Sequence, residues 1–395
     1  MLIPIPKPLN PVQANISQPA IGCSAIRGGR GANHPLCLVL FVIAAVACPA
    51  LPASASPPGG IFTRQVVLKN MAANCIVPGV LELATDANEL STVSRRLMDN
   101  PNPGTLTQAK AAVIKMQLAY KRNQMLAYGP VENQIFWQAN FYTHPSPDAI
   151  ERMIRSQQPI DQKFIERQGA MVKGFSTAEY LVLGLTDKAG LDNAPDSADS
   201  RLLQGDTAAR RRQYLCAITE NLAKQLQAAA RQAQAPDFPS RFASGGQASI
   251  NLLVNELTVT LESGLTIPLQ DSLKLSQAKN MPGKSGNITM GYSIPEMKAL
   301  LQGLIRFYHA GEGRTGLNDY MLHVNPGLNN RLEAQFNTTS AALSAINKPL
   351  DTMVATQRPV VQTAFEETHR LELLLKVDLT SALGVTIMFN AYDGD

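Results

Sequence analysis

The sequence predicts an all-α protein made of two successive antiparallel helical bundles. Aromatic residues make up only 6% of the 395 residues, while Ala, Leu and Gln recur through the long segments, a composition typical of packed helices. Apolar residues recur at helical spacing in most segments, and the connections between them are short. A chain of this length suits about two domains.

The first 55 residues are predicted to be a signal peptide and not part of the fold. Three basic residues and no acidic residue accompany the apolar run 36–48, and the small-residue site Ala-Ser-Ala follows at 53–55. This is the composition of a secretory leader, and the run is too short for a comfortable membrane span. We therefore expect an exported protein whose mature chain starts near Ser56. Lipidation of Cys48 is the alternative, and it would tether the protein to a membrane.

Charge and cysteine content narrow the classes of function. Removing the leader takes away three basic residues, so the formal charge of +4 falls to +1. That balance is not the basic footprint of a nucleic-acid-binding protein. The mature chain keeps two cysteines, Cys75 and Cys216. They could form a disulfide in an oxidising compartment, and two buried free thiols are the alternative that the sequence leaves open.

Helical patterns follow one another through the predicted first domain, residues 56–240. Prolines and glycines at 99–104 and 129–130 end two of them, and Ser146-Pro147-Asp148 is a typical helix start. A further helix begins in the stretch GFSTAEYLVLG, residues 174–184. The expected helices are 61–97, 106–128, 146–169, the helix starting within 174–184, and 206–234.

The stretch APDFPSRFASGG, residues 235–246, is the predicted domain boundary because two prolines and two glycines interrupt the helical pattern there. The second domain would be residues 241–395. Ser293 and Glu296 have the spacing of a capping box. The expected helices are 247–275, 293–309, 316–324, 327–346 and 354–383, and residues 385–395 are predicted to form one short strand or an extended tail.

The usual catalytic signatures are missing from the sequence. It contains no HExxH, no glycine-rich phosphate loop, no CxxC and no GxSxG. His369 and Glu372 are three residues apart on one side of a predicted helix, so they could supply two metal ligands. The apolar face of that helix leaves His369 towards its edge. We interpret the two residues as a solvated polar pair.

GFSTAEYLVLG places one carboxylate, Glu179, in an otherwise apolar or small-residue stretch, and two interpretations compete. Ser176 and Glu179 have the spacing of a capping box, with Phe175 and Tyr180 as a hydrophobic staple, which would explain the stretch without any function. Alternatively, the carboxylate is used by the protein, because burying an ionisable group is costly unless it is paired, capped or used.

The same stretch resembles the G-x-H-x-x-E motif of the imelysin family, which includes a metallopeptidase and iron-regulated proteins. Gly174 and Glu179 match the first and last motif positions, and Ser176 stands where the family has histidine. The segments 127–133, 291–321 and 382–395 resemble the family as well. The resemblance therefore extends over residues of about 60 to 395.

The resemblance implies an exported two-domain protein of the bacterial periplasm or outer membrane, with iron or haem uptake components of the cell envelope as partners. It implies a site at the domain junction, with Gly174, Ser176, Glu179 and Tyr180 as ligand-binding residues and Glu179 as a ligand to iron or zinc. Glu179 is expected at the wall or mouth of a cleft, close to Ser176.

Serine in place of the motif histidine weakens the case for catalysis. An un-ionised hydroxyl is neither a good metal ligand nor a general base, so no catalytic residue is assigned. We prefer the hypothesis of a binding protein that assists iron, haem or other metal uptake. A metallopeptidase of the imelysin type and a metal-free scaffold that binds other proteins are the alternatives.

Overall fold

Helices form the regular structure throughout the residues that the computed structural model describes, which are 63–126, 134–141, 145–156, 158–184, 198–278, 293–311 and 313–387. No strand occurs within these ranges, so the all-α prediction is confirmed. The predicted leader, residues 127–133 and the end of the chain from 388 lie outside the described residues.

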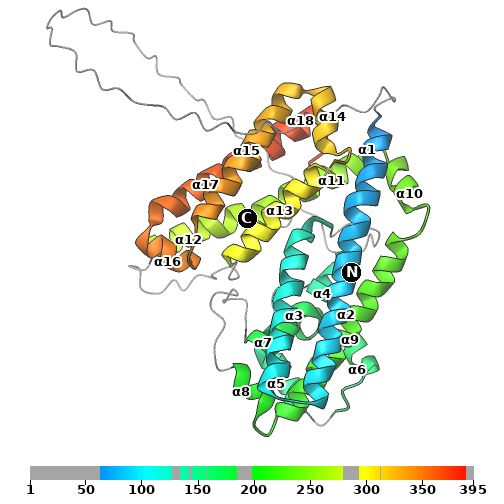
Figure 1. The fold of residues 1–395 in the computed structure, drawn as a ribbon, viewed down its shortest axis with the longest axis vertical. Coiled ribbons are helices and arrows are strands. Elements are labelled where there is room, and N and C mark those ends of the chain that lie inside the picture. Colours follow the sequence, from blue (N-terminus) through cyan, green and yellow to red (C-terminus); the bar gives the residue numbers. More distant parts are fainter. Residues whose placement is uncertain are drawn as a thin grey trace, which may run out of the picture. The chain divides into compact units, whose positions relative to one another are not determined.

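A long helix opens the described chain. α1 (Arg64–Met71), η1 (Ala72–Ile76) and α2 (Val77–Asp99) are continuous, as the apolar spacing predicts. α2 packs along α3 (Pro103–Arg122) and α9 (Ala208–Ala233), and the three helices are seen side by side in Figure 1. The continuous helix is long and apolar enough to cross a membrane, but half of its most apolar window is buried within the protein, as in a core helix.

Two of the long helices contain a π-helical turn directly before a proline-bearing turn. η1 precedes Pro78, and η5 (Glu262–Thr266) precedes Pro268 in the helix that runs from α11 (Gln247–Leu261) to α12 (Ile267–Ala278). Proline has no N–H to donate to the preceding turn, and the wider π turn accommodates the missing hydrogen bond.

Short helices connect α3 to α9. The helix predicted over 146–169 is in fact two helices, α5 (Pro147–Arg155) and α6 (Gln162–Glu166). Ser156 is extended and Pro159 follows it, and a proline disfavours helix both at and before its own position. Asp161 then caps α6 by accepting a hydrogen bond from the backbone N–H of Phe164 at 2.7 Å. The connecting elements are η2 (Gln124–Leu126), α4 (Gln134–Phe141), α5 (Pro147–Arg155), α6 (Gln162–Glu166), η3 (Ala170–Val172), α7 (Gly174–Leu183) and α8 (Ala198–Leu203).

The segment predicted as a domain boundary contains a helix, α10 (Phe238–Ser244), which packs against α1. Phe238 and Ala243 are buried, so apolar contacts hold this segment to the fold. The described residues after Pro58 form one compact unit by their contacts. The division of the mature chain near residue 240 stays a prediction.

The second half of the chain follows the predicted helices closely. α15 (Pro326–Ala345) packs on α17 (Arg358–Leu373), which also packs on α12, and α13 (Ile294–Tyr308) packs on α15. Ser293 and Glu296 form the predicted capping box at the start of α13. The elements are α13 (Ile294–Tyr308), α14 (Leu317–Val324), α15 (Pro326–Ala345), α16 (Leu350–Thr356), α17 (Arg358–Leu373), η6 (Leu374–Leu379) and α18 (Thr380–Leu383).

Contact between the two halves of the chain is made chiefly by α3 and α13. Gly303 of α13 lies against the backbone of Arg122, so closely that a Cβ atom at 303 would be 2.1 Å from the Arg122 carbonyl oxygen. The missing side chain therefore lets the end of α3 approach α13. The side chains around Glu179 come from α3 and α13, the two helices of this contact.

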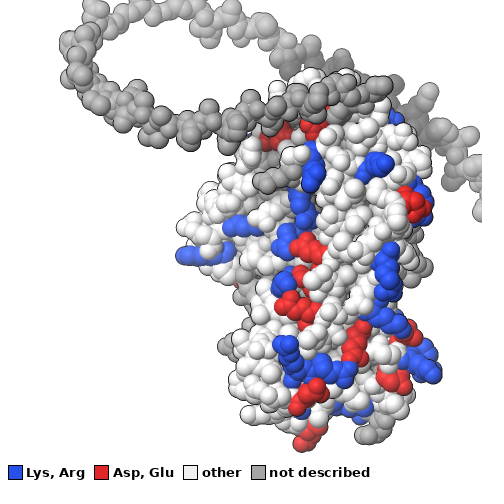
Figure 2. Space-filling model, turned by 45° about the vertical axis from the view of Figure 1, so that its right-hand side comes forward, with Lys and Arg blue, Asp and Glu red and all other residues white. Residues whose placement is uncertain are grey.

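Basic and acidic side chains are interspersed on the face of the molecule drawn in Figure 2. The described side chains on that face make no broad patch of one sign. This agrees with the small formal charge predicted for the mature chain and gives no support there to a nucleic-acid surface.

Candidate functional site

Gly174 fixes the start of α7, the helix that carries Glu179. Its φ of +75° lies in the left-handed region, and a Cβ atom there would be 2.6 Å from the carbonyl oxygen of Asn140. Glycine is the residue that tolerates both conditions. The next residue, Phe175, is buried, with its ring centroid 6.1 Å from that of Phe141 on α4. The motif glycine is thus a structural residue that seats α7 on α4.

The capping-box interpretation of Ser176 and Glu179 is wrong. α7 begins at Gly174 with Lys173 as its N-cap residue, and no side chain caps it. Ser176 is therefore the third residue of the helix and not its N-cap, and Glu179 is the sixth residue and not the third, so the two cannot form a capping box. The staple assigned to Phe175 and Tyr180 fails for the same reason. The explanation of Glu179 as a helix-start residue no longer applies.

Glu179 is buried, with 9% of its surface exposed. Burial and the neighbouring carboxylate of Glu296 on α13 raise the pKa of Glu179 to about 8, and the ammonium group of Lys121 on α3 opposes them. No described residue forms a hydrogen bond with its carboxyl group. At neutral pH Glu179 is therefore mostly a neutral carboxylic acid.

Glu296 is held by two hydrogen bonds. The Gln117 side-chain amide donates to Oε1, and the backbone N–H of Ser293 donates to Oε2 at 2.6 Å. Glu296 is more buried than Glu179, at 3% exposure. The two carboxyl groups thus differ. Hydrogen bonds from α3 and from the capping box hold Glu296 in place, whereas Glu179 lies near the charges of Glu296 and Lys121 and receives no hydrogen bond from the described residues.

Lys121 supplies the positive charge of the site. It is 5% exposed, and its Nζ donates to Gln124 Oε1 at 3.4 Å. Its Nζ also lies 5.7 Å from the centroid of the Tyr120 ring. With Glu179 protonated, Lys121 and Glu296 balance each other in charge. The group formed by Glu179, Glu296 and Lys121 can therefore bind a ligand that makes hydrogen bonds. It can bind a cation if Glu179 loses its proton.

Tyr180, a predicted ligand-binding residue, belongs to a different cluster. Its hydroxyl donates to Glu151 Oε1 at 2.7 Å, and Glu151 also pairs with Arg211 of α9. Ser176, in contrast, precedes Glu179 by three residues in α7, so the two share a helix face, and Ser176 is buried as well. The structure keeps Ser176 with Glu179 and separates Tyr180 from them.

The residues of this site do not fit a resident metal centre. No three His, Cys, Asp or Glu side chains come together as a metal-binding group anywhere in the described ranges. Two carboxyl groups fall short of the three protein ligands of a catalytic zinc site, and Lys121 opposes a bare cation.

His369 and Glu372 form a pair, and among the described residues no third metal-binding side chain joins them. His369 Nδ1 lies 3.6 Å from Glu372 Oε2, and the imidazole is exposed, as the sequence predicts. Glu372 itself is buried, so only half of the pair is solvated.

Cys75 and Cys216 are free thiols in this structure, and a disulfide between them in an oxidising compartment stays a prediction. Cys75 Sγ lies 3.6 Å from the carbonyl oxygen of Arg306, and Cys216 Sγ lies 3.6 Å from Glu220 Oε1. Each sulfur is enclosed by its own set of neighbours, and both residues are buried.

Sequence reasoning missed Gln117 and Lys121. They lie four apart on α3 among polar residues that recur as on an ordinary helix surface, and no local pattern marks them as buried. Glu296 was found only as a capping residue. Its second role, beside Glu179, depends on how α3, α7 and α13 pack.

The long paired helices and the buried glutamate that follows Gly174 define an imelysin-like helical protein. The model of the imelysin family matches residues 76–374, and the chain belongs to that family. A search of curated proteins finds no significant match.

Two solved structures share the fold. One is an imelysin-like protein from Psychrobacter arcticum 273-4, with 14% identity and a TM-score of 0.64. The other is a candidate iron-regulated protein A precursor from Parabacteroides distasonis ATCC 8503, with 17% identity and a TM-score of 0.62. Each alignment covers 82% of this chain and 97% of the other.

Proposed function

We propose that this chain is an exported imelysin-type binding protein that assists bacterial iron or haem uptake, and that Glu179 contacts the cargo. The observation that carries the proposal is the position of Glu179. It is buried beside Glu296 and Lys121 and receives no hydrogen bond from the described residues. Buried ionisable groups with strongly shifted pKa values cluster at functional sites.

The free-energy cost of burying Glu179 favours a role in binding over a purely structural role. A carboxyl group whose pKa is raised to about 8 destabilises the folded state at neutral pH and above. The capping role that would have offset this cost is absent. A ligand that donates hydrogen bonds or brings positive charge would supply the missing partner.

Binding is favoured over catalysis by the residues around Glu179. Ser176 replaces the histidine that could serve as a base, and the described site brings only two carboxyl groups to a metal. Iron would therefore arrive as cargo inside haem or a chelate, which brings most of its own ligands. The iron-regulated name of one structural neighbour supports this choice.

Export and uptake partners are part of the same proposal. The leader-like composition of residues 1–55 supports export to the periplasm or attachment to the outer membrane. Mass spectrometry of the exported protein tests this, with an N-terminus near Ser56 as the expected result. A diacylated Cys48 would instead place the protein on a membrane.

Calorimetric titration of the mature protein with haemin and, separately, with ferric citrate tests the binding role. The wild type is expected to bind one of these probes, and Glu179→Gln is expected to weaken that binding at least about tenfold, the effect of losing one charge-assisted hydrogen bond. Glu166→Gln, at an exposed glutamate of α6, is the matched control and should bind as the wild type does. Absence of binding to both probes, or equal binding by Glu179→Gln, would overturn the proposal.

A further inference from the structure

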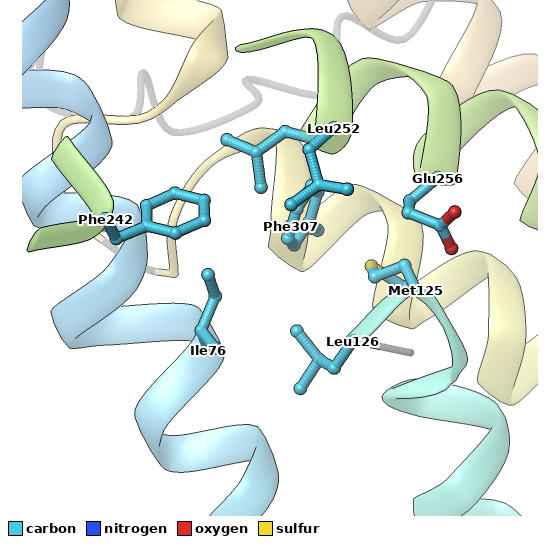
Figure 3. A pocket seen from close by; sticks show the side chains of 8 residues that line it. Ile76, Met125, Leu126, Phe242, Leu252, Glu256 and Phe307 are labelled. Carbon is cyan, nitrogen blue, oxygen red and sulfur yellow. The ribbon is translucent and has the colours of Figure 1, made fainter. Parts of the chain in front are cut away.

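The interior pocket drawn in Figure 3 is nearly filled by its own side chains. Seven apolar residues and Glu256 of α11 line it, and they leave room for about one water molecule. Glu256 is 7% exposed and makes no hydrogen bond or ion pair with any described residue, and its carboxyl group points away from the other lining side chains. An organic ligand does not fit there. The surface of the molecule has a larger apolar feature, at the start of α1.

α14 packs beside the start of α1 (Figure 1). Arg64 Nε, in the first turn of α1, donates to the Tyr320 hydroxyl at 3.2 Å. Farther along α1, Asn70 Nδ2 donates to the carbonyl oxygen of Thr315 at 3.0 Å. The two helices therefore run antiparallel, and the C-terminal end of α14 lies at the N-terminal end of α1.

Three large aliphatic side chains are exposed at this end of the molecule. Val66, Leu322 and Val324 are each between 43% and 48% exposed. Val66 is one turn before Asn70 and thus on the side of α1 that contacts α14. Leu322 and Val324 belong to an exposed corner, residues 322–327, between α14 and α15. We call Val66 and this corner, with the first turns of α1, the α1–α14 face.

The sequence of the α1–α14 face is basic. α1 contains Arg64 and Lys69 and no acidic residue, and residues 320–332 contain Arg331 and no acidic residue. Arg331 pairs with Asp378 of η6 at 3.1 Å, so the excess positive charge comes from α1. Exposed aliphatic side chains beside basic ones complement the surface of an anionic bilayer.

One acidic side chain of α14 lies near this face. Asp319 accepts a hydrogen bond from the backbone N–H of Gly316 at 3.0 Å, at the start of the helix and away from the exposed corner. It offsets one of the two positive charges of α1. The face therefore keeps a net positive charge.

The chain enters the described structure at the same face. Thr63 is the N-cap residue of α1, and residues 1–62 precede it. If Cys48 is lipidated, the alternative to cleavage after Ala55, residues 49–62 connect the lipid to the face. A chain of that length spans at most about 50 Å. A lipid anchor at Cys48 would thus keep the α1–α14 face close to the bilayer.

We propose that the α1–α14 face docks on the surface of a bilayer that contains anionic lipid. Val66, Leu322 and Val324 would enter the interfacial region of the bilayer, and Arg64 and Lys69 would contact lipid phosphate groups. Docking through so few residues is weak and reversible, and a lipid anchor would strengthen it. A second copy of this chain is a poorer partner because it would bring the same positive charge to the contact.

Flotation of the mature protein, starting at Ser56, with lipid vesicles tests the proposal. Vesicles of phosphatidylcholine with phosphatidylglycerol are compared with vesicles of phosphatidylcholine alone. The wild type is expected to associate about tenfold more strongly with the anionic vesicles, and added salt should remove this preference. Combining Leu322→Ser with Val324→Ser should weaken association at least about tenfold, because two apolar side chains no longer enter the bilayer.

Ile114→Ser, at an exposed aliphatic residue of α3, is the matched control and should associate as the wild type does. Because all three serine substitutions are at exposed positions, thermal unfolding should be little changed. Glu179→Gln should also associate as the wild type does, so docking and iron-linked binding are tested separately.

Four results would overturn the proposal. They are no association of the wild type with anionic vesicles, undiminished association of the double serine variant, an equal loss in Ile114→Ser, and a dimer in gel filtration that the double serine variant abolishes. The last result would assign the face to a second copy of the chain.

Discussion

Glu179 on α7 and Glu296 on α13 are buried carboxyl groups from opposite halves of the chain, and the negative charge of Glu296 helps to raise the pKa of Glu179. Removing that charge should therefore lower the pKa of Glu179 from about 8 towards its ordinary range, although burial would keep it elevated. Carboxyl ¹³C NMR titration of Glu296→Gln measures the change. An unchanged Glu179 pKa would show that the two groups do not interact.

The raised pKa values of two buried glutamates, Glu179 and Glu256, predict how the stability of the protein depends on pH. Folding raises the pKa of both Glu179 and Glu256 from the ordinary 4.5 to about 8. Stability from their neutral forms is fully present below about pH 4.5 and is lost as pH rises towards 8. Each glutamate should then cost on the order of 2–3 kcal/mol at about pH 7.

Replacing either glutamate by glutamine should consequently stabilise the protein at about pH 7 to 8 and leave it little changed at about pH 4.5. Urea unfolding across this pH range measures the effect. The expected signature is a flatter pH profile in each variant. A variant that loses stability at about pH 8 would contradict the assignment of a buried, unpaired carboxyl group.

Gly174→Ala should be strongly destabilising. The new Cβ atom would meet the Asn140 carbonyl oxygen at 2.6 Å in a backbone with φ of +75°, so strain and collision add to about 3 kcal/mol or more. Gly205→Ala is the control, because Gly205 has a φ of +93° with open space around it. Thermal unfolding should show a clearly larger loss at 174, and equal losses would mean that α4 does not constrain α7.

The thiols should be slow to react in the folded protein. Burial raises the pKa of Cys75 to about 11, against the opposing charge of Arg306, and burial raises the pKa of Cys216 as well. Because the thiolate is the reactive form, iodoacetamide should modify both residues only after unfolding. Nonreducing peptide mapping that found a Cys75–Cys216 bridge would contradict the free thiols.

The helices could be predicted from local patterns, but the site could not. Apolar spacing and the prolines located α2, α9 and α13, and the Ser293–Glu296 capping box depends only on neighbouring residues. The start of α7 was misjudged because Gly174 adopts a left-handed conformation that the contact with α4 imposes. The grouping of Glu179, Glu296 and Lys121 required the packing of three helices that no local pattern encodes.

Glu179 is kept for binding at a cost in stability, and one variant tests both its binding role and its cost. Glu179→Gln should raise the unfolding free energy at about pH 7.5 by on the order of 3 kcal/mol and, in the same preparation, lose most of the wild-type affinity for haemin or ferric citrate. A variant that is less stable than the wild type and binds the same probe equally well would contradict the account.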